Sequence, residues 1–195
     1  MFQKIDENDY NTLIETFVSQ QYAWLASKLE PHTVAIDIGA HCGDSAIYMA
    51  QKENVDLVLA FDNDPGPAKR AEAIMMQAQP TVRQKIMYEL AEVVGQENGK
   101  FEVWIPQITI RKILSRQRNP TVIKCDCEGA EHEIFTDAAL GAADLERVYA
   151  VQIEYHRGPQ GLPRFFSGMG FCVEVMPPWY HDESLGDVGW LHAWR

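Results

Sequence analysis

Hydrophobic residues recur along this chain with two different periods. Spacings of three and four residues are typical of amphipathic helices, whereas short continuous apolar runs are typical of buried strands. The helical spacing is longest over residues 11–29, and it predicts one amphipathic helix laid across the core and ended by Pro31. Shorter helices are predicted over residues 44–51, 67–79, 110–116, 131–137 and 163–169.

Apolar runs predict strands between these helices. They cover residues 33–38, 56–62, 87–94, 101–105, 121–126, 148–154, 171–176 and 189–195, with loop chemistry at residues 95–99. Because strands and helices alternate, the sequence predicts an α/β fold, a Rossmann-like, doubly wound and mostly parallel sheet covered on both faces. The last two strands have no helix between them, which predicts an antiparallel pair at the C-terminal edge.

Composition limits the size and the partners of the protein. The 195 residues, 46% of them hydrophobic, are enough for one core, so we expect a single domain over residues 1–195 with residues 1–30 as a helical segment packed on it. The net charge of −11 disfavours nucleic acid and anionic membranes, which attract clustered Lys and Arg. We find neither the apolar segment of a signal peptide nor a run of about 18 apolar residues, and therefore expect a cytoplasmic protein.

The four cysteines do not form a Cys-x-x-Cys pair. We expect reduced core thiols at Cys42, Cys125, Cys127 and Cys172. If the strand continues through both, Cys125 and Cys127 point to opposite faces.

The first predicted strand runs into a glycine turn and then a helix. Gly39 and Gly43 let the backbone approach a ligand closely at a helix N-terminus, as in nucleotide-type cofactor sites. The pattern is Asp37-x-Gly39-Ala40-x-x-Gly43 rather than Gly-x-Gly-x-x-Gly, and an acid before the turn would repel a pyrophosphate. Asp37 suits the ammonium group and ordered water around the methionine portion of S-adenosylmethionine, which favours that sulfonium cofactor over NAD.

A second acidic residue lies at the position where a nucleotide-type cofactor site has a ribose-binding carboxylate. Asp62 ends the next strand about twenty residues after the turn, the usual separation for a carboxylate that receives ribose hydroxyls. The alternative is that the two glycines only permit tight strand-to-helix packing and that Asp62 is a solvated loop acid. Order and spacing together favour the cofactor site.

A cluster of acids follows the predicted strand over residues 121–126, at the edge where ligands bind in such sheets. Asp126 and Glu128 are candidates for function. For Glu131 we favour the role of a first-turn helix acid, stabilised by the helix dipole.

Lys124 is unusual within an apolar strand, because a buried lysine needs a partner. We expect a carboxylate from a neighbouring strand, such as Asp37 or Glu154, to meet it. The alternative is that Lys124 lies on a half-exposed face.

The next strand ends in Glu154-Tyr155-His156. His156 could take a proton from a hydroxyl acceptor, although a loop histidine is more often simply solvated. Together with Asp126 and Glu128, Glu154 and His156 could also supply ligands to Mg²⁺ or a similar cation. No signature spacing supports a metal, so we predict none.

These segments together resemble the FkbM-type family of S-adenosylmethionine-dependent methyltransferases, from about Thr33 to the C-terminus. The most specific element is the block over residues 123–131, which is similar to the family's Lys-Ile-Asp-Val-Glu-Gly-Ala-Glu. Residues 35–43, 61–65, 152–156 and 170–171 are similar to the family's cofactor loop, ribose-binding segment, Glu-containing strand end and Gly-Phe pair. Asp62 replaces the usual glutamate, Asn63 a proline and Cys127 an aliphatic residue.

The resemblance implies an O-methyltransferase in which an acceptor oxygen attacks the sulfonium methyl in line, with positioning supplying most of the catalysis. The acceptor is expected to be a hydroxyl on a small molecule or a sugar. The residues expected to bind the cofactor are Asp37, Gly39, Ala40, His41, Gly43, Asp62 and Asn63. The candidate catalytic residues are Asp126, Glu128 and His156.

An aromatic-rich segment, residues 177–182, lies between the last two strands and could cover an acceptor. We favour the alternative that its Trp179 and Tyr180 are loop anchors packed on the core. Two other classes of protein remain open: an NAD-dependent oxidoreductase, and a non-enzymatic binding module on the same fold.

Overall fold

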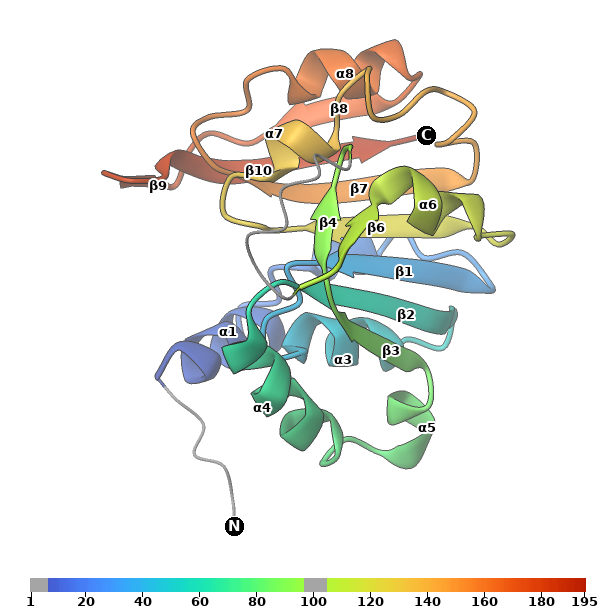
Figure 1. Cartoon of the computed structure of the whole chain (residues 1–195), viewed down its shortest axis with the longest axis vertical. Helices are drawn as coiled ribbons and strands as arrows, with labels where there is room; N and C mark the ends of the chain where they lie inside the picture. The colour runs from blue at the N-terminus through green and yellow to red at the C-terminus, as the bar shows by residue number, and fades with distance from the viewer. Residues whose placement is uncertain (1–6, 97–104) are drawn as a thin grey trace.

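A mostly parallel sheet forms the centre of the protein, whose computed structural model describes residues 7–96 and 105–195 (Figure 1). The strands run in the order β3-β2-β1-β6-β7-β10-β8. The parallel strands are β1 (Thr33–Ile38), β2 (Val55–Asp62), β3 (Ile86–Leu90), β6 (Thr121–Cys125) and β7 (Val148–Tyr155). The antiparallel part consists of β10 (Gly186–Trp194), which lies between β7 and β8 (Cys172–Val175). The predicted Rossmann-like α/β fold and its antiparallel C-terminal pair are confirmed.

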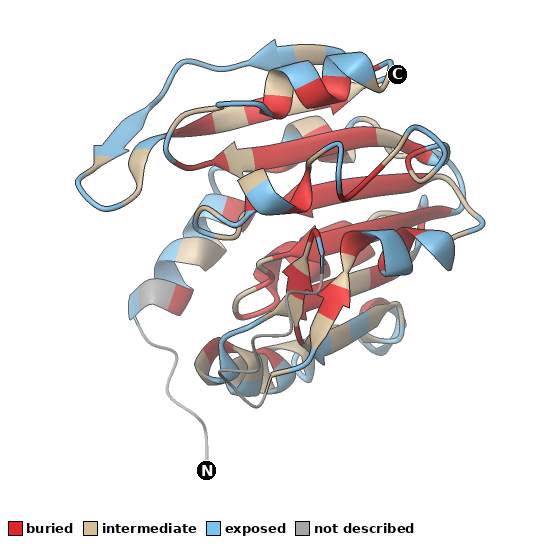
Figure 2. Ribbon diagram, turned by 45° about the horizontal axis from the view of Figure 1, so that its top comes forward, coloured by how far each residue is buried: buried red, intermediate tan, exposed pale blue. Residues whose placement is uncertain are grey.

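The central strands are apolar at nearly every position because both faces of the sheet are covered. Every residue of β1 and β6 is buried, and Figure 2 shows the burial fading toward the edge strands. Successive residues enter opposite faces, so that Ile36 belongs to one apolar cluster and Ala35 to another. Two cores therefore hold the sheet between two layers.

Helices supply these two layers. They are α3 (Asp44–Ala50), α4 (Pro65–Met75), α5 (Pro80–Arg83), α6 (Ile110–Ser115), α7 (Glu131–Ile134) and α8 (Leu162–Gly168). The start of α4 has a clear physical cause, because the Asp64 carboxylate accepts the backbone N–H of Gly66 at 2.7 Å and Pro65 occupies the first helical position. None of the described helices has the length and hydrophobicity that crossing a bilayer requires.

The predicted single helix near the N-terminus is wrong. The chain forms α1 (Glu7–Phe17) and the short α2 (Ala23–Ala26), with a break between them. The side chain of Gln152, wholly buried on β7, explains the break: it donates to the carbonyl of Gln21 at 2.8 Å and accepts the N–H of Leu25 at 3.3 Å. These tertiary hydrogen bonds replace helical ones and pin the segment to the sheet.

The helix α1 is also tied to the helices that follow the first two strands. The Arg70 Nε on α4 lies 2.6 Å from a carboxylate oxygen of Asp9, whose side chain is fully buried. The hydroxyl of Thr16 donates to the carboxylate of Asp44 at the start of α3. These contacts place α1 beside the carboxyl ends of the central strands (Figure 1).

The predicted strand over residues 87–94 is also divided. It ends at Leu90, and β4 (Glu92–Val94) pairs instead with β5 (Gln107–Thr109) in a separate two-stranded sheet. The N–H of Ala91 donates to the carbonyl of Asp62 at 2.9 Å, which completes the parallel ladder before the chain turns away. The strand expected over residues 101–105 lies outside the described residues except for Ile105, which is in a bend.

The cysteines are free thiols, but not all lie in the core. Cys172 is exposed and Cys127 half-buried, which corrects the expectation of four core thiols. Because β6 ends at Cys125, the chain leaves strand geometry there, and the two sulfur atoms of Cys125 and Cys127 lie 3.4 Å apart rather than on opposite faces.

Candidate active site

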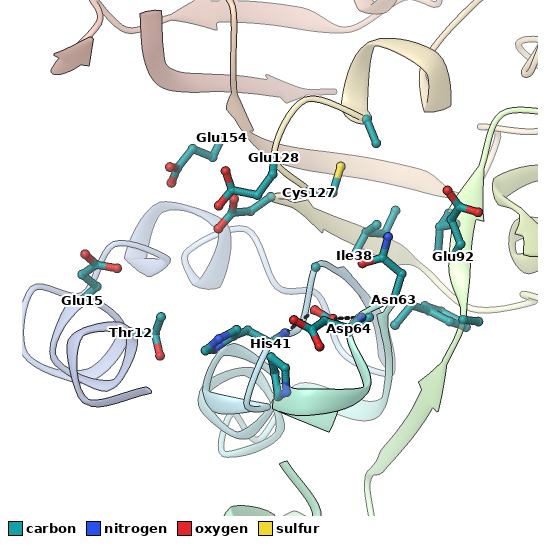
Figure 3. Close-up of a pocket in the computed structure, with 18 of the residues that line it drawn as sticks. Thr12, Glu15, Ile38, His41, Asn63, Asp64, Glu92, Cys127, Glu128 and Glu154 are labelled. Atoms are coloured by element: carbon teal, nitrogen blue, oxygen red, sulfur yellow. Dashed lines mark hydrogen bonds between the residues drawn. The ribbon is translucent and has the colours of Figure 1, made fainter. Parts of the chain in front are cut away.

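A cavity of about 670 Å³ lies at the carboxyl ends of the central parallel strands, where ligands bind in open α/β sheets. Its described lining residues include no Lys or Arg. They include seven carboxylates: Glu15, Asp62, Asp64, Glu92, Asp126, Glu128 and Glu154. Figure 3 shows Glu128 and Glu154 on one side of the cavity, opposite His41 and Asp64. The site therefore suits a cationic ligand.

Gly39 lets two strand ends approach one another at the floor of the cavity. Its φ is +75°, and a Cβ at this position would lie 1.7 Å from the carbonyl oxygen of Asp126. Only a residue without a side chain fits this contact. The glycine turn therefore brings the predicted cofactor loop against the predicted catalytic loop.

The backbone N–H groups of the turn are already in use. Gly39 and Ala40 donate to the carbonyl of Phe61 at 2.9 and 3.0 Å, and Gly43 donates to the carbonyl of Ala40 at 2.7 Å. His41, at a φ of +44°, donates its N–H to the Asp62 carboxylate at 2.8 Å. This turn does not offer those N–H groups to a phosphate.

Asp62 is held in a fixed orientation at the wall of the cavity. One of its carboxylate oxygens accepts the N–H of His41, and the other accepts the N–H of Asp64 at 2.8 Å. Each carboxylate oxygen has a second acceptor position, so both remain able to accept a hydroxyl from a ligand. Asn63 is exposed beside it and also lines the cavity.

Lys124 meets Asp37, as expected for a buried lysine. Its Nζ lies 3.1 Å from Oδ1 of Asp37 and donates to the carbonyl of Gly39 at 2.6 Å. Although burial favours the neutral amine, the carboxylate of Asp37 holds the pKa of Lys124 above its ordinary value. The hydroxyl of Ser45 donates to the other oxygen of Asp37 at 2.6 Å. The half-exposed alternative is excluded, because Lys124 is only 4% exposed.

Three residues of the predicted cofactor site lie behind the cavity wall rather than on it. Asp37, Ala40 and Gly43 are buried and are not among the lining residues. Gly43, with a φ of +81°, precedes α3 and lets the chain enter that helix. These residues shape the turn, whereas Gly39, His41, Asp62 and Asn63 reach the cavity.

The acceptor side of the cavity carries three carboxylates with few compensating contacts. Asp126, Glu128 and Glu154 accept no side-chain or backbone hydrogen bond from the other described residues, apart from ion-pair distances such as the 3.9 Å between Lys124 Nζ and Asp126. Burial first, and then the charge of Asp126, raises the pKa of Glu154 to about 9. The same two causes raise the pKa of Glu128, whose φ of +57° is unusual for a residue with a side chain.

His156 is buried behind these carboxylates instead of being solvated. Its ring Nδ1 lies 3.2 Å from Oε1 of Glu131, and its backbone N–H donates to the same oxygen at 2.7 Å. Its Nε2 faces Glu128 at 3.6 Å and Glu154 at 3.9 Å. Burial opposes the imidazolium, but the hydrogen bond and charge of Glu131 outweigh it and raise the pKa of His156. His156 does not line the cavity itself.

Sequence reasoning missed the role of Glu131. It does begin α7, but its side chain is wholly buried, and it orients His156 as well as accepting the N–H of Gly129 at 2.8 Å. Although burial disfavours its charge, these hydrogen bonds, led by that from His156, lower the pKa of Glu131. A contact between a glutamate at the start of a helix and a histidine after a distant strand has no signature in one sequence.

Other lining residues come from elements that the sequence analysis placed outside the site. Thr12 and Glu15 enter from α1, and Glu92 from β4. Trp179 also lines the cavity although 60% of its surface is exposed, which makes the expectation of a core-packed anchor wrong. Tyr180, at the start of β9 (Tyr180–Asp182), is 52% exposed. The hairpin of β9 and β10 projects from the sheet (Figure 1).

Comparison with solved structures identifies the class of fold. The chain superposes on the methyltransferase FkbM from Methylobacillus flagellatus with a TM-score of 0.63 and 17% identity, over 88% of this chain and 46% of that one. For a putative rRNA-methylase from Clostridium thermocellum the TM-score is 0.60 at 9% identity, over 91% and 96% of the two chains. For TrmK from M. capricolum, bound to S-adenosylhomocysteine, the TM-score is 0.56 at 16% identity, over 89% of this chain and 67% of that one.

The fold of this chain is therefore the Rossmann-like fold seen in these solved methyltransferases. No protein-family model matches the chain, and no curated protein matches it. The chain spans about half the length of the FkbM structure that it resembles.

Proposed function

We propose that this protein is an S-adenosylmethionine-dependent methyltransferase that transfers the methyl group to a hydroxyl of a small molecule or sugar. One observation carries the proposal: one cavity has an oriented Asp62 on one wall, and on the other it has Asp126, Glu128 and Glu154, which accept no hydrogen bond from the described residues. The first wall suits a ribose and the second a polar acceptor. The FkbM-type motifs and the fold support the same assignment.

The chemistry of the cofactor wall supports S-adenosylmethionine over NAD. The N–H groups of Gly39, Ala40, His41 and Gly43 donate to protein acceptors, and acids line the cavity, so a pyrophosphate would meet negative charge. A cofactor with a sulfonium and an ammonium group brings positive charge instead. Gly39, His41, Asp62 and Asn63 contact it in this proposal, while Asp37, Ala40 and Gly43 support the turn from behind.

The proposed reaction is an in-line displacement. The acceptor oxygen forms a bond to the methyl carbon as the bond from carbon to sulfur breaks, and the sulfonium leaves as a thioether. The hydroxyl proton passes to Asp126 or Glu128, because Glu154, whose pKa is raised to about 9 by burial and by Asp126, already carries a proton at neutral pH. Asp126 and Glu128 hold the acceptor, and His156 supports Glu128 and Glu154 from behind.

The acceptor is small and carries several hydroxyls in this proposal. Trp179 gives the mouth of the cavity an exposed flat face on which a sugar ring can stack. The acidic lining argues against RNA, since phosphates bind where Lys and Arg gather. A polyhydroxylated acceptor, by contrast, donates hydrogen bonds to carboxylates.

Thermal unfolding with S-adenosylmethionine, S-adenosylhomocysteine and NAD in parallel tests the cofactor. A ligand at a hundredfold its Kd stabilises the native state by about 2.7 kcal/mol, so the first two should raise the melting temperature and NAD should not. A shift with NAD alone would identify an oxidoreductase. No shift with any of the three would reject the cofactor site.

Transfer of a labelled methyl group to a panel of sugars and small alcohols then separates an enzyme from a binding module. We expect label in at least one acceptor and none in a reaction without it. Cofactor binding with no transfer across a wide panel would favour the non-enzymatic alternative.

A further inference from the structure

We propose that Asp126, Glu154 and His156 form a binding site for a divalent cation on the acceptor wall. Each offers one ligand atom, and the three atoms lie within 4.8 Å of one another. Three atoms so placed can all lie within about 2.8 Å of one point, and small side-chain movements reach the 2.0–2.2 Å of typical metal bonds to carboxylate and imidazole.

The backbone explains why these ligands converge without a sequence signature. Asp126 directly follows β6, whereas Glu154 and His156 lie at the end of β7, and the two strands are parallel neighbours. Their carboxyl ends therefore meet at one edge of the sheet. Glu154 is 14% and Asp126 25% exposed at the side chain, so both are accessible from the cavity yet largely shielded from water.

The hydrogen bonding of the His156 ring is that of a typical metal-ligating histidine. A ligating histidine generally gives its other ring nitrogen to a carboxylate, which fixes the ring and its tautomer. Here Nδ1 lies 3.2 Å from Oε1 of Glu131, and Nε2 lies 3.9 Å from Oε1 of Glu154. Within residues 7–96 and 105–195, Nε2 has no hydrogen bond, although the His156 side chain is only 2% exposed.

The carboxylates of Asp126 and Glu154 also have little positive charge close to them. The Nζ of Lys124 approaches this group, but it is already bound to Asp37 at 3.1 Å and to the carbonyl of Gly39 at 2.6 Å. Its distance to Asp126 is 3.9 Å. A dication between Asp126 and Glu154 would add positive charge beside two carboxylates that share Lys124 with Asp37 and accept no hydrogen bond from it.

Two carboxylates and one imidazole indicate which ion fits best. Oxygen ligands alone suit Mg²⁺ and Ca²⁺, whereas an imidazole adds preference for first-row transition metals. Mn²⁺ accepts both kinds of ligand, so it is the probe of choice. On the methyltransferase function proposed above, the ion would bind the acceptor hydroxyl beside Glu128 and make its proton easier to remove.

Binding of Mn²⁺ followed by electron paramagnetic resonance tests the site without any need for activity. We expect one bound ion per chain, with affinity at least tenfold weaker in both Asp126→Asn and Glu154→Gln. Glu15→Gln is the matched control, because it removes an unpaired carboxylate from the same cavity but outside the three ligands, and it should leave the affinity unchanged. Equal weakening by all three variants would mean diffuse attraction to an acidic surface and would overturn the proposal.

A second measurement on the wild-type protein covers the case in which a variant does not fold. Electron spin echo spectra of bound Mn²⁺ should show coupling to a directly bonded imidazole nitrogen. Absence of that coupling, or absence of any bound ion at millimolar Mn²⁺, would overturn the site. Binding of a polyamine in place of Mn²⁺ would overturn it too, and would point to an amine acceptor.

Binding of S-adenosylhomocysteine, measured in the same samples with chelator, keeps this inference separate from the proposed function. Loss of Mn²⁺ binding with cofactor binding intact rejects the cation site alone. Mn²⁺ binding without cofactor binding supports the cation site and rejects the methyltransferase.

Discussion

The two walls of the cavity differ in whether protein groups donate hydrogen bonds to their carboxylates. The cofactor wall is formed by Gly39, His41 and residues 62–64, with Asp37 buried behind it. The carboxylates of Asp37 and Asp62 both lie 2.6 to 3.1 Å from protein donors. On the acceptor wall, Asp126, Glu128 and Glu154 hold none among the described residues, and Glu154 has a pKa raised to about 9 by burial and by Asp126. The carboxylates of the first wall are therefore held by protein donors, whereas those of the second await a ligand that is positively charged or donates protons.

This difference separates two uses of buried charge. A buried polar group that is hydrogen-bonded contributes to one defined structure, while an unpaired one costs free energy until a ligand satisfies it. We therefore expect changes on the cofactor wall to reduce stability or cofactor affinity, and neutralising changes on the acceptor wall to increase the stability of the free protein.

The largest effect should come from Lys124→Met. Breaking a buried ion pair by removing one partner typically costs about 3–5 kcal/mol, because the remaining charge of Asp37 is left uncompensated. Urea unfolding of the two proteins measures the loss. The double variant Asp37→Asn/Lys124→Met should recover part of it, and a loss below about 1 kcal/mol in the single variant would show that the pair is not what completes this wall.

Gly39→Ala should be the next most damaging change. The added Cβ would meet the carbonyl of Asp126 at 1.7 Å, and the φ of +75° disfavours alanine, so we expect a loss of about 2–4 kcal/mol in urea unfolding. Gly168→Ala is the control: its Cβ would meet nothing within 4 Å, and its stability should change by less than about 1 kcal/mol. Equal effects of the two variants would contradict the close contact between the walls.

Asp62→Ala should weaken the binding of S-adenosylhomocysteine by about 10- to 100-fold, the loss expected for a hydrogen bond to a charged group. Titration calorimetry measures this, with circular dichroism as a check that the fold is kept. Asp56→Ala, at the start of the same strand beside the exposed His32, should bind as the wild type does. Unchanged affinity in Asp62→Ala would remove Asp62 from the ribose site.

Glu154→Gln should have the smallest effect and the opposite sign. In chelator at pH 8, we expect it to stabilise the protein by about 1 kcal/mol or more, equivalent to about 2–4 °C. Because the folded pKa of Glu154 is raised to about 9, the native state retains a proton that the unfolded chain releases near pH 4.5. The wild type should therefore lose stability as the pH rises between these values, and the variant should lose less. A destabilised variant would mean that the Glu154 carboxylate is already satisfied.

The sequence allowed more to be predicted about the cofactor wall than about the acceptor wall. Gly39 and His41 lie in one turn, and Asp62 ends the next strand. Turn chemistry and spacing were therefore enough to predict that the three residues share a site. The parallel order and the antiparallel end followed from the alternation of helices and strands. Lys124 could be paired in advance because a buried charge demands a partner.

The remaining features depend on contacts between distant segments. Glu131 reaches His156 across 25 positions, and Gln152 interrupts the N-terminal helix from 131 positions away. Neither contact produces a hydrophobic period or a sequence motif from which it could be predicted. The break between Leu90 and Glu92 had the same origin, since β4 finds its partner in β5 rather than in the main sheet.

Titration of S-adenosylhomocysteine into the wild-type protein, once in chelator and once with Mn²⁺, tests the contrast between the walls most directly. If the cofactor wall binds without help from the acceptor wall, one equivalent of S-adenosylhomocysteine binds in both buffers. The two affinities then agree within about threefold, a difference below about 0.7 kcal/mol. Binding that requires Mn²⁺, or no binding in either buffer, would contradict the account.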